Sequence, residues 1–115
     1  MLMNTIDAAT FAELQASTGA DFVVELVDAF LADAPPLLAA MRLAQAAGDA
    51  VAFRRAAHSL KSNGLTFGAF AFGAQAREVE ETGLVALGDQ VMPKLQQLES
   101  TYAAVASALQ KLNHG

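Results

Sequence analysis

His58 is the residue in this sequence with the clearest capacity for chemistry. An imidazole can act near neutral pH as a nucleophile, a base or a metal ligand. The ring stands in the run RRAAHSLKSNGLTFGA, residues 54–69, among small and basic side chains. No His-x-x-x-His or Glu-x-x-His pair accompanies it, and the second histidine, His114, lies in the C-terminal tail. We therefore expect no metal site.

The neighbourhood of His58 is a basic window in an acidic chain. The protein has 115 residues and a net charge of −5, yet no Asp or Glu lies between Asp49 and Glu78. Four of the seven Lys and Arg residues fall in this interval: Arg54, Arg55, Lys61 and Arg77. We expect this surface to face an anion or an acidic protein, whereas the net charge argues against nucleic-acid binding. A solvated basic face without a partner is the simpler alternative.

The helical phase around His58 predicts an exposed ring. At 100° per residue, a core stripe falls roughly opposite the histidine, and it consists of Phe53, Ala56, Leu60 and Phe67. The row on the same side as His58 consists of Arg54, Lys61 and Leu65. Burying His58 would expose the core stripe, which disfavours an interior histidine but leaves an inert surface histidine open.

Small residues beside His58 leave room for a bulky group. They are Ser59, Ser62 and Gly64. Glycine inside a helix costs about 1 kcal/mol relative to alanine. Gly64 therefore indicates either the close approach of another backbone or a partner, or the end of the helix.

The rest of the chain is expected to form helices. Alanine is abundant, only three prolines occur, and valine and isoleucine are too scattered to suggest strands. Capping residues and apolar periodicity predict a short helix from Asp7 to about Ser17 and a second helix from near Asp21. Pro35 and Pro36 either kink the second helix or open a third segment, which Gly48 closes.

The same signals predict three further helices. Asp49 caps the helix that carries His58, and this helix extends to about Gly64 or Phe67. The next helix ends near Gly83, and the last runs from about Val85, or only from Pro93, to Leu112. We predict an all-α protein, an antiparallel four-helix bundle with a short additional N-terminal helix, forming one domain over residues 1–115.

Several classes of function are excluded or disfavoured. The absence of cysteine excludes disulfides and thiol catalysis. The N-terminus does not resemble a signal peptide and no stretch resembles a membrane span, so we expect a soluble cytoplasmic protein. No nucleophile elbow and no glycine loop for ATP occur, so a phosphoryl group would have to come from another protein.

The run AHSLKSNGLTFGA resembles the signature of histidine-containing phosphotransfer (HPt) domains of multistep two-component relays. That signature is Ala-His-x-Leu-Lys, a small residue, and Gly-Ala ten and eleven residues after the histidine. The matching residues are Ala57, His58, Leu60, Lys61, Gly68 and Ala69. The resemblance covers nearly the whole chain and implies a four-helix bundle. Ser62 departs from a frequent glycine, and Gly64 stands where many members carry serine.

The resemblance implies a role for each site residue. His58 would accept a phosphoryl group on Nε2 from the aspartyl phosphate of one receiver domain and pass it to another. Lys61 would neutralise the phosphoryl oxygens, and Glu80, aligned with a polar residue of the following helix, would hold the Nδ1 proton and orient the ring. As the simpler alternative, Glu80 is a solvated surface charge. The expected docking surface consists of Arg54, Arg55, Ser62, Gly64, Leu65 and Gly68.

The resemblance also implies the partners. They would be response-regulator receiver domains, including those of hybrid histidine kinases, and Mg²⁺ would be bound by the receiver. The protein itself would be a monomeric phosphoryl carrier with no cofactor and no ATP site, rather than an enzyme.

Two alternatives remain. One is the histidine-bearing dimerisation domain of a sensor kinase, which usually has an acidic residue directly after the histidine, where this chain has Ser59. The other is a non-catalytic helical adaptor for an acidic partner, in which His58→Gln would leave function intact.

Overall fold

The computed structural model describes residues 5–114, and this part of the chain is helical without strands. The elements, in order, are α1 (Ala8–Thr18), α2 (Ala20–Ala47), α3 (Ala50–Thr66), α4 (Phe70–Thr82), α5 (Leu84–Leu87), the 3₁₀ turn η1 (Gly88–Gln90) and α6 (Val91–His114). Within the described residues, no helix has the length and hydropathy needed to cross a membrane.

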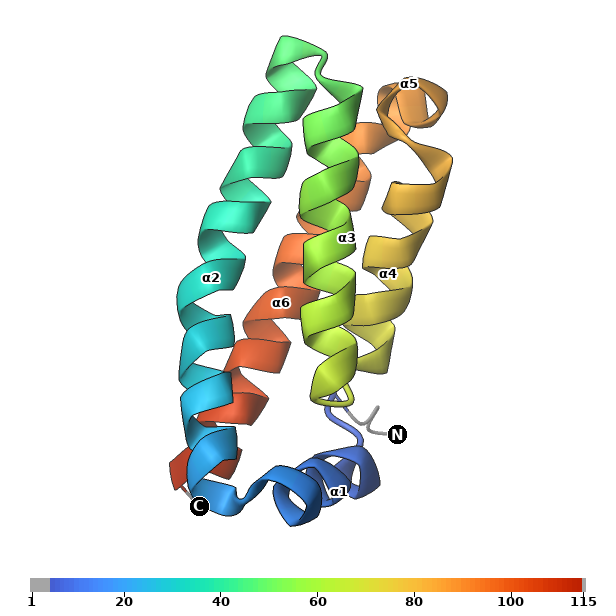
Figure 1. Cartoon of the computed structure of the whole chain (residues 1–115). Helices are drawn as coiled ribbons and strands as arrows, with labels where there is room; N and C mark the ends of the chain where they lie inside the picture. The colour runs from blue at the N-terminus through green and yellow to red at the C-terminus, as the bar shows by residue number, and fades with distance from the viewer. Residues whose placement is uncertain (1–4, 115) are drawn as a thin grey trace.

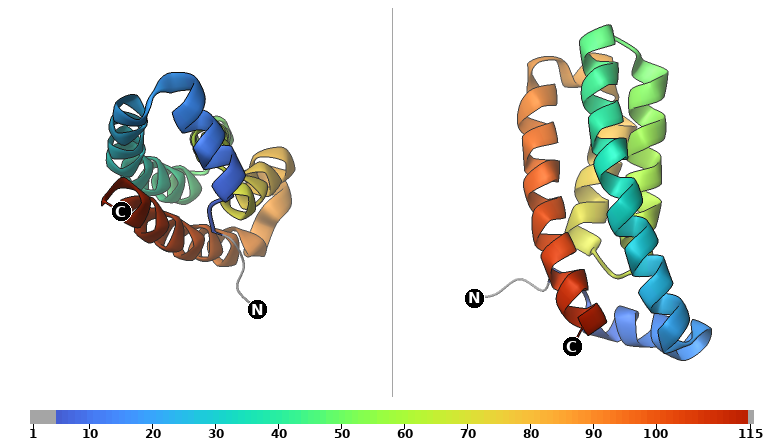
Figure 2. Two further views of the ribbon diagram at one scale, coloured as in Figure 1. Left: turned by 90° about the horizontal axis from the view of Figure 1, so that it is seen from below. Right: turned by 90° about the vertical axis from the view of Figure 1, so that its left-hand side faces the viewer.

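Four of these helices form an antiparallel bundle. Helices α2, α3, α4 and α6 run alternately up and down, and α1 lies across one end (Figure 1). Each packs on two neighbours, in the ring α2–α3–α4–α6, as the view along the bundle shows (Figure 2). This architecture confirms the predicted all-α, four-helix bundle with a short N-terminal helix.

Two aspartates begin helices where the sequence predicted. The Asp7 carboxylate accepts a hydrogen bond of 3.0 Å from the Thr10 amide at the start of α1. The Asp49 carboxylate accepts one of 3.0 Å from the Ala52 amide at the start of α3. Both bonds satisfy amides that have no partner within the helix. Since Asp49 fixes where α3 begins, it also fixes the rotational phase of His58, nine residues later.

Helix α2 continues through both prolines and ends at the C-cap Gly48, so the expected third segment is the second half of α2. A proline has no amide hydrogen, so Pro35 leaves the Leu31 carbonyl without its helical donor. The Tyr102 hydroxyl of α6 donates a long hydrogen bond of 3.5 Å to that carbonyl. The Leu31 carbonyl thus finds a donor on a neighbouring helix, and α2 continues past the prolines.

The start of the last helix differs from the prediction at Val85. The short α5 ends at Leu87, Gly88 has φ +52°, and α6 begins only at Val91. Pro93 therefore falls in the first turn of α6, where a missing amide hydrogen costs nothing. The apolar pattern continued across this break because Leu84 and Leu87 are buried like the residues that follow.

The core is apolar and includes a cluster of aromatic rings. The Phe30 ring of α2 lies 5.5 Å from Phe67, 6.3 Å from Phe72 and 5.8 Å from Tyr102, measured between centroids. Such tilted and edge-on pairs are favoured over face-to-face stacking. This cluster joins α2, α4, α6 and the end of α3, and so holds the helix that carries His58 against its neighbours.

Candidate functional site

The structure places His58 on the outer face of α3. Its side chain is 59% exposed, whereas Phe53 and Leu60 are completely buried on the opposite side of the helix. The phase prediction is therefore confirmed: the apolar stripe faces the bundle and the imidazole faces outward. Burial of the stripe fixes α3 in rotation, so the direction of the ring follows from packing on the far side of the helix.

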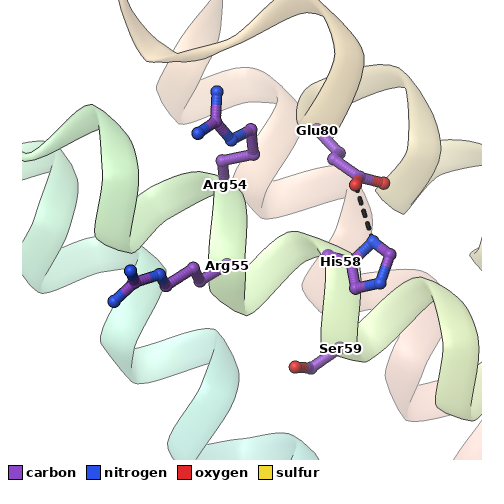
Figure 3. Close-up of a pocket in the computed structure, with 5 residues that line it drawn as sticks. All are labelled: Arg54, Arg55, His58, Ser59 and Glu80. Carbon is purple, nitrogen blue, oxygen red and sulfur yellow. Dashed lines mark hydrogen bonds and ion pairs between the residues drawn. The ribbon is translucent and has the colours of Figure 1, made fainter.

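Glu80 of α4 contacts the ring. Its Oε2 lies 2.7 Å from Nδ1 of His58 (Figure 3), and its side chain is only 16% exposed. An ionised carboxylate can only accept hydrogen bonds, so this contact assigns the proton to Nδ1. Nε2, on the other side of the ring, then carries the free lone pair. The contact that the family resemblance implied is present, and it leaves Nε2 on the side of the ring away from Glu80.

Lys61 also contacts Glu80. Its helical phase had predicted that it would be exposed in a row with His58, and the structure differs from that prediction. Its ammonium lies 2.8 Å from Oε1 of Glu80, and its side chain is 17% exposed. That oxygen has no hydrogen bond of good geometry, so the contact is chiefly an ion pair. The reason for the difference is the length of the lysine side chain, which folds across the α3–α4 contact to the nearest carboxylate.

The ion pair affects the ionisation of Glu80. Contact with the Lys61 ammonium, aided by the contact with His58, holds the pKa of Glu80 below its usual value, although burial acts in the opposite direction. The carboxylate is therefore charged at neutral pH, and it can hold the imidazole proton and the ammonium at once.

An open depression of about 450 Å³ lies beside the ring, lined by Arg54, Arg55, His58, Ser59 and Glu80. Arg54 and Arg55 come from the turn of α3 before His58 and extend outward in different directions (Figure 3). Neither guanidinium forms an ion pair with any residue in the range 5–114. Two cations are thus available at the rim to an anion or an acidic surface.

Two predicted docking residues lie on the surface on the other side of His58. Ser62 is exposed and Leu65 is 37% exposed. Leu65 packs over Gly73 of α4 and lines a shallow hollow with Phe70, which is 50% exposed. The sequence does not indicate that Phe70 is exposed, because Phe70 is the first residue of α4 and no earlier residue of that helix sets its rotational phase.

The two glycines of the predicted docking surface are buried, and this part of the prediction is wrong. A Cβ atom at Gly64 would lie 2.7 Å from Cδ2 of the Phe72 ring. The close approach that Gly64 indicated is therefore made by α4, not by a partner, and α3 continues past it to Thr66.

Gly68 is buried in the turn between α3 and α4. It has φ +84°, and a Cβ there would lie 3.1 Å from the Asp7 carbonyl oxygen. Its own carbonyl accepts a 2.9 Å hydrogen bond from the Asp7 amide. Gly68 thus joins α1 to the bundle and takes no part in the surface around His58.

The described residues contain no group of three or more His, Asp or Glu side chains arranged to hold a metal ion. The site consists of an exposed imidazole, a partly buried carboxylate on its Nδ1, an ammonium on that carboxylate and two arginines at the rim. Such an arrangement presents one nucleophilic nitrogen to an incoming electrophile.

Comparison with known proteins gives two matches. The family model described as the Hpt domain matches residues 25–113. The crystal structure of histidine-containing phosphotransfer protein B (HptB) from Pseudomonas aeruginosa PAO1 superposes with a TM-score of 0.90 at 26% sequence identity. The alignment covers 98% of this chain and 97% of that one. No curated protein sequence matches this chain.

Proposed function

This chain belongs to the Hpt domain family, whose members are phosphoryl carriers of two-component signalling, and we propose that it relays the phosphoryl group between receiver domains on Nε2 of His58. The observation that carries the proposal is the orientation of the ring. Its Nδ1 is engaged by Glu80, while Nε2 lies on the exposed side of a side chain that is 59% exposed.

The proposed reaction is an in-line displacement at phosphorus. The Nε2 lone pair forms a bond to the phosphorus of an aspartyl phosphate on the first receiver. The P–O bond breaks, and its electron pair remains on the receiver's carboxylate. Attack by the aspartate of a second receiver reverses these bond changes. The Mg²⁺ that neutralises the phosphoryl oxygens belongs to the receiver, and no ATP site is needed on the carrier.

Four surface residues would dock the receiver. Arg54 and Arg55 would attract its acidic active-site surface, since unpaired cations at a rim raise the rate of encounter with an acidic partner. Ser62 and Leu65 would form contacts on the other side of the ring, where a small polar and an apolar side chain, one helical turn apart, are both exposed. We propose that the carrier does this as a monomer.

The role proposed for Lys61 needs a movement. Its ammonium is 2.8 Å from Glu80 in the unphosphorylated protein. To neutralise phosphoryl oxygens directly, it would have to leave this ion pair once the ring is phosphorylated. Until then Lys61 acts on the site through Glu80.

A transfer assay tests the proposed function. The protein is incubated with a receiver domain carrying labelled aspartyl phosphate, and the protein-bound label is tested for stability in acid and base. We expect acid-labile, base-stable label in the wild type and none in His58→Gln, which should keep its fold because the side chain is exposed. Absence of label with several receivers would support the adaptor alternative, and label in His58→Gln would place the acceptor elsewhere.

A further inference from the structure

Two further hollows continue from the depression at His58 along the groove between α2 and α3. The first, of about 390 Å³, is lined by Asp33, Pro36 and Leu37 of α2 and by Ser59 and Asn63 of α3. The second, of about 160 Å³, shares Asp33 and Asn63 with the first. Ser59 lines both the first hollow and the depression at His58, and it projects from α3 on the side away from Glu80 (Figure 3). The α2–α3 groove therefore adjoins the site directly.

Asp33 is the acidic side chain of this groove. It is exposed, and it forms no ion pair with any residue in the range 5–114. The other side chains that line the two hollows are uncharged. Arg54 and Arg55, in contrast, lie one turn of α3 before His58. The surface around the ring is therefore divided by charge, with two cations on α3 and a carboxylate across the groove on α2.

A receiver that docks on His58 would cover the α2–α3 groove. A specific interface of standard size buries about 800 Å² on each partner, which corresponds to a patch of roughly 16 Å radius. The axes of packed helices are about 8–10 Å apart, and α2 and α3 lie side by side (Figure 1). A patch centred on the exposed ring of α3 therefore extends across the groove to Asp33.

Covering Asp33 has an energetic consequence for the complex. A carboxylate that is removed from water without a cation or a hydrogen-bond donor weakens binding. No side chain that lines the groove carries a positive charge, so the cation has to come from the receiver. The carboxylate also repels the acidic side chains that Arg54 and Arg55 attract. A single charge thus favours receivers with a cation at this point and disfavours receivers without one.

We propose that Asp33 determines which receivers this carrier accepts, by pairing in the α2–α3 groove with a lysine or arginine of the docked receiver. The inference rests on the proposed function of His58 and adds a specificity-determining residue to it. Asp33 touches neither the imidazole nor the phosphoryl group. It therefore acts on the binding of the receiver and not on the transfer step within the complex.

The first experiment reverses the charge of Asp33. Wild type, Asp33→Lys and Glu25→Lys are each mixed with the phosphorylated receiver domain that, among a panel of receivers, transfers label fastest to the wild type. Glu25 is also exposed on α2 and unpaired within residues 5–114, but it lines neither hollow. Both substitutions make the net charge less negative by the same amount. The transfer rate is measured against carrier concentration at low salt, which separates the half-saturating concentration from the maximal rate.

The expected result is a loss of binding for Asp33→Lys alone. Its half-saturating concentration should rise about tenfold, and its maximal rate should stay within about twofold of the wild type. Glu25→Lys should bind as tightly as the wild type or slightly more tightly, since the carrier becomes less acidic. Attraction by net charge alone would also tighten the binding of Asp33→Lys. Tighter or unchanged binding of Asp33→Lys would therefore overturn the inference while leaving the carrier function intact.

The second experiment identifies the cation on the receiver. Each lysine and arginine on the face of that receiver that carries the aspartyl phosphate is changed to glutamate, one at a time. One of these receivers should transfer poorly to the wild type and should be restored with Asp33→Lys, because the reversed charges pair again; Glu25→Lys should not restore it. The absence of any restored pair would contradict the inference. Failure of the wild type to accept label from any receiver would instead contradict the proposed function.

Discussion

The segment of residues 50–69, which includes α3 and the turn after it, consists of two parts with different roles. In residues 50–61 of α3, the side chains of Arg54, Arg55 and His58 are exposed. In residues 62–69, Gly64, Gly68 and the following alanine are buried against α4 and α1. The exposed side chains of the first part present chemical groups to a partner, whereas the glycines of the second part allow α3 to pack closely against α4 and the N-cap of α1.

This difference shows that a signature motif combines reactive and architectural positions. The docking surface expected from the sequence includes Gly64 and Gly68 together with residues beside the histidine. The structure separates them: Gly64 admits the Phe72 ring, and Gly68 admits the backbone at Asp7. In contrast, Glu80 completes the chemical site from α4, outside the motif.

The largest effect should come from filling the space at Gly64. Gly64→Val would force side-chain atoms against the Phe72 ring, which is fully buried and cannot move into solvent. We expect a loss of about 3 kcal/mol in the free energy of unfolding, measured by urea denaturation. Ser62→Val, on the exposed side of the same helix, is the control and should change stability by less than about 0.5 kcal/mol. Equal midpoints for both variants would contradict the close packing of Gly64 against Phe72.

A smaller loss is expected at Gly68. A side chain in the left-handed region costs roughly 1–2 kcal/mol, and at Gly68 it would also press on Asp7. Gly83→Ala is a matched control, because Gly83 has φ +83° but no atom within 4 Å of its added Cβ. Gly68→Ala should therefore be the less stable variant in thermal unfolding. If the two variants melt together, the contact between Gly68 and α1 contributes nothing.

Substitutions in residues 50–61 of α3 should affect binding rather than stability. Removing both cations with Arg54→Gln and Arg55→Gln should leave the melting temperature unchanged, since neither side chain is paired within residues 5–114. Association with an acidic receiver, measured by stopped flow, should slow by about tenfold at low salt, and the difference should shrink at high salt. Lys111→Gln, exposed near the end of α6, is the control and should bind at the wild-type rate. A slower rate that is independent of salt would count against electrostatic steering.

The smallest effect concerns the stability that the chemical site itself contributes. Contact with Lys61 lowers the pKa of Glu80 in the folded protein. The contribution of the ionised Glu80 to the free energy of unfolding is therefore fully present above the pKa that Glu80 has in the unfolded state. It is lost as the pH falls through the lower pKa of the folded state. Glu80→Gln should be less stable than wild type by under about 1 kcal/mol at pH 7. The melting temperatures of wild type and Glu80→Gln should converge as the pH is lowered. A difference that stays constant with pH would mean that the ion pair between Glu80 and Lys61 is not the cause of the difference in stability.

The sequence correctly predicted the features that depend on residues close together along the chain. The caps at Asp7 and Asp49 and the helix end at Gly83 are local signals, and the phase of His58 follows from apolar residues within two turns. Only the resemblance to the HPt family indicates that Glu80 lies near the ring.

The features that the sequence analysis missed depend on packing between segments. The burial of Gly64 is decided by a ring from α4, and the direction of Lys61 by a carboxylate 19 residues later. The helix break at Gly88 lies within an apolar pattern that continues on both sides, so periodicity alone could not find it.

The short separation of His58 and Glu80 along the chain has a consequence for folding kinetics. His58 and Glu80 are 22 residues apart, on two antiparallel helices joined by the short turn between Thr66 and Phe70. Closing so short a loop costs little chain entropy, and local helical hairpins form early in fast-folding proteins. The imidazole and its carboxylate should therefore meet among the first tertiary contacts, before α6 closes the bundle against α2 and α4.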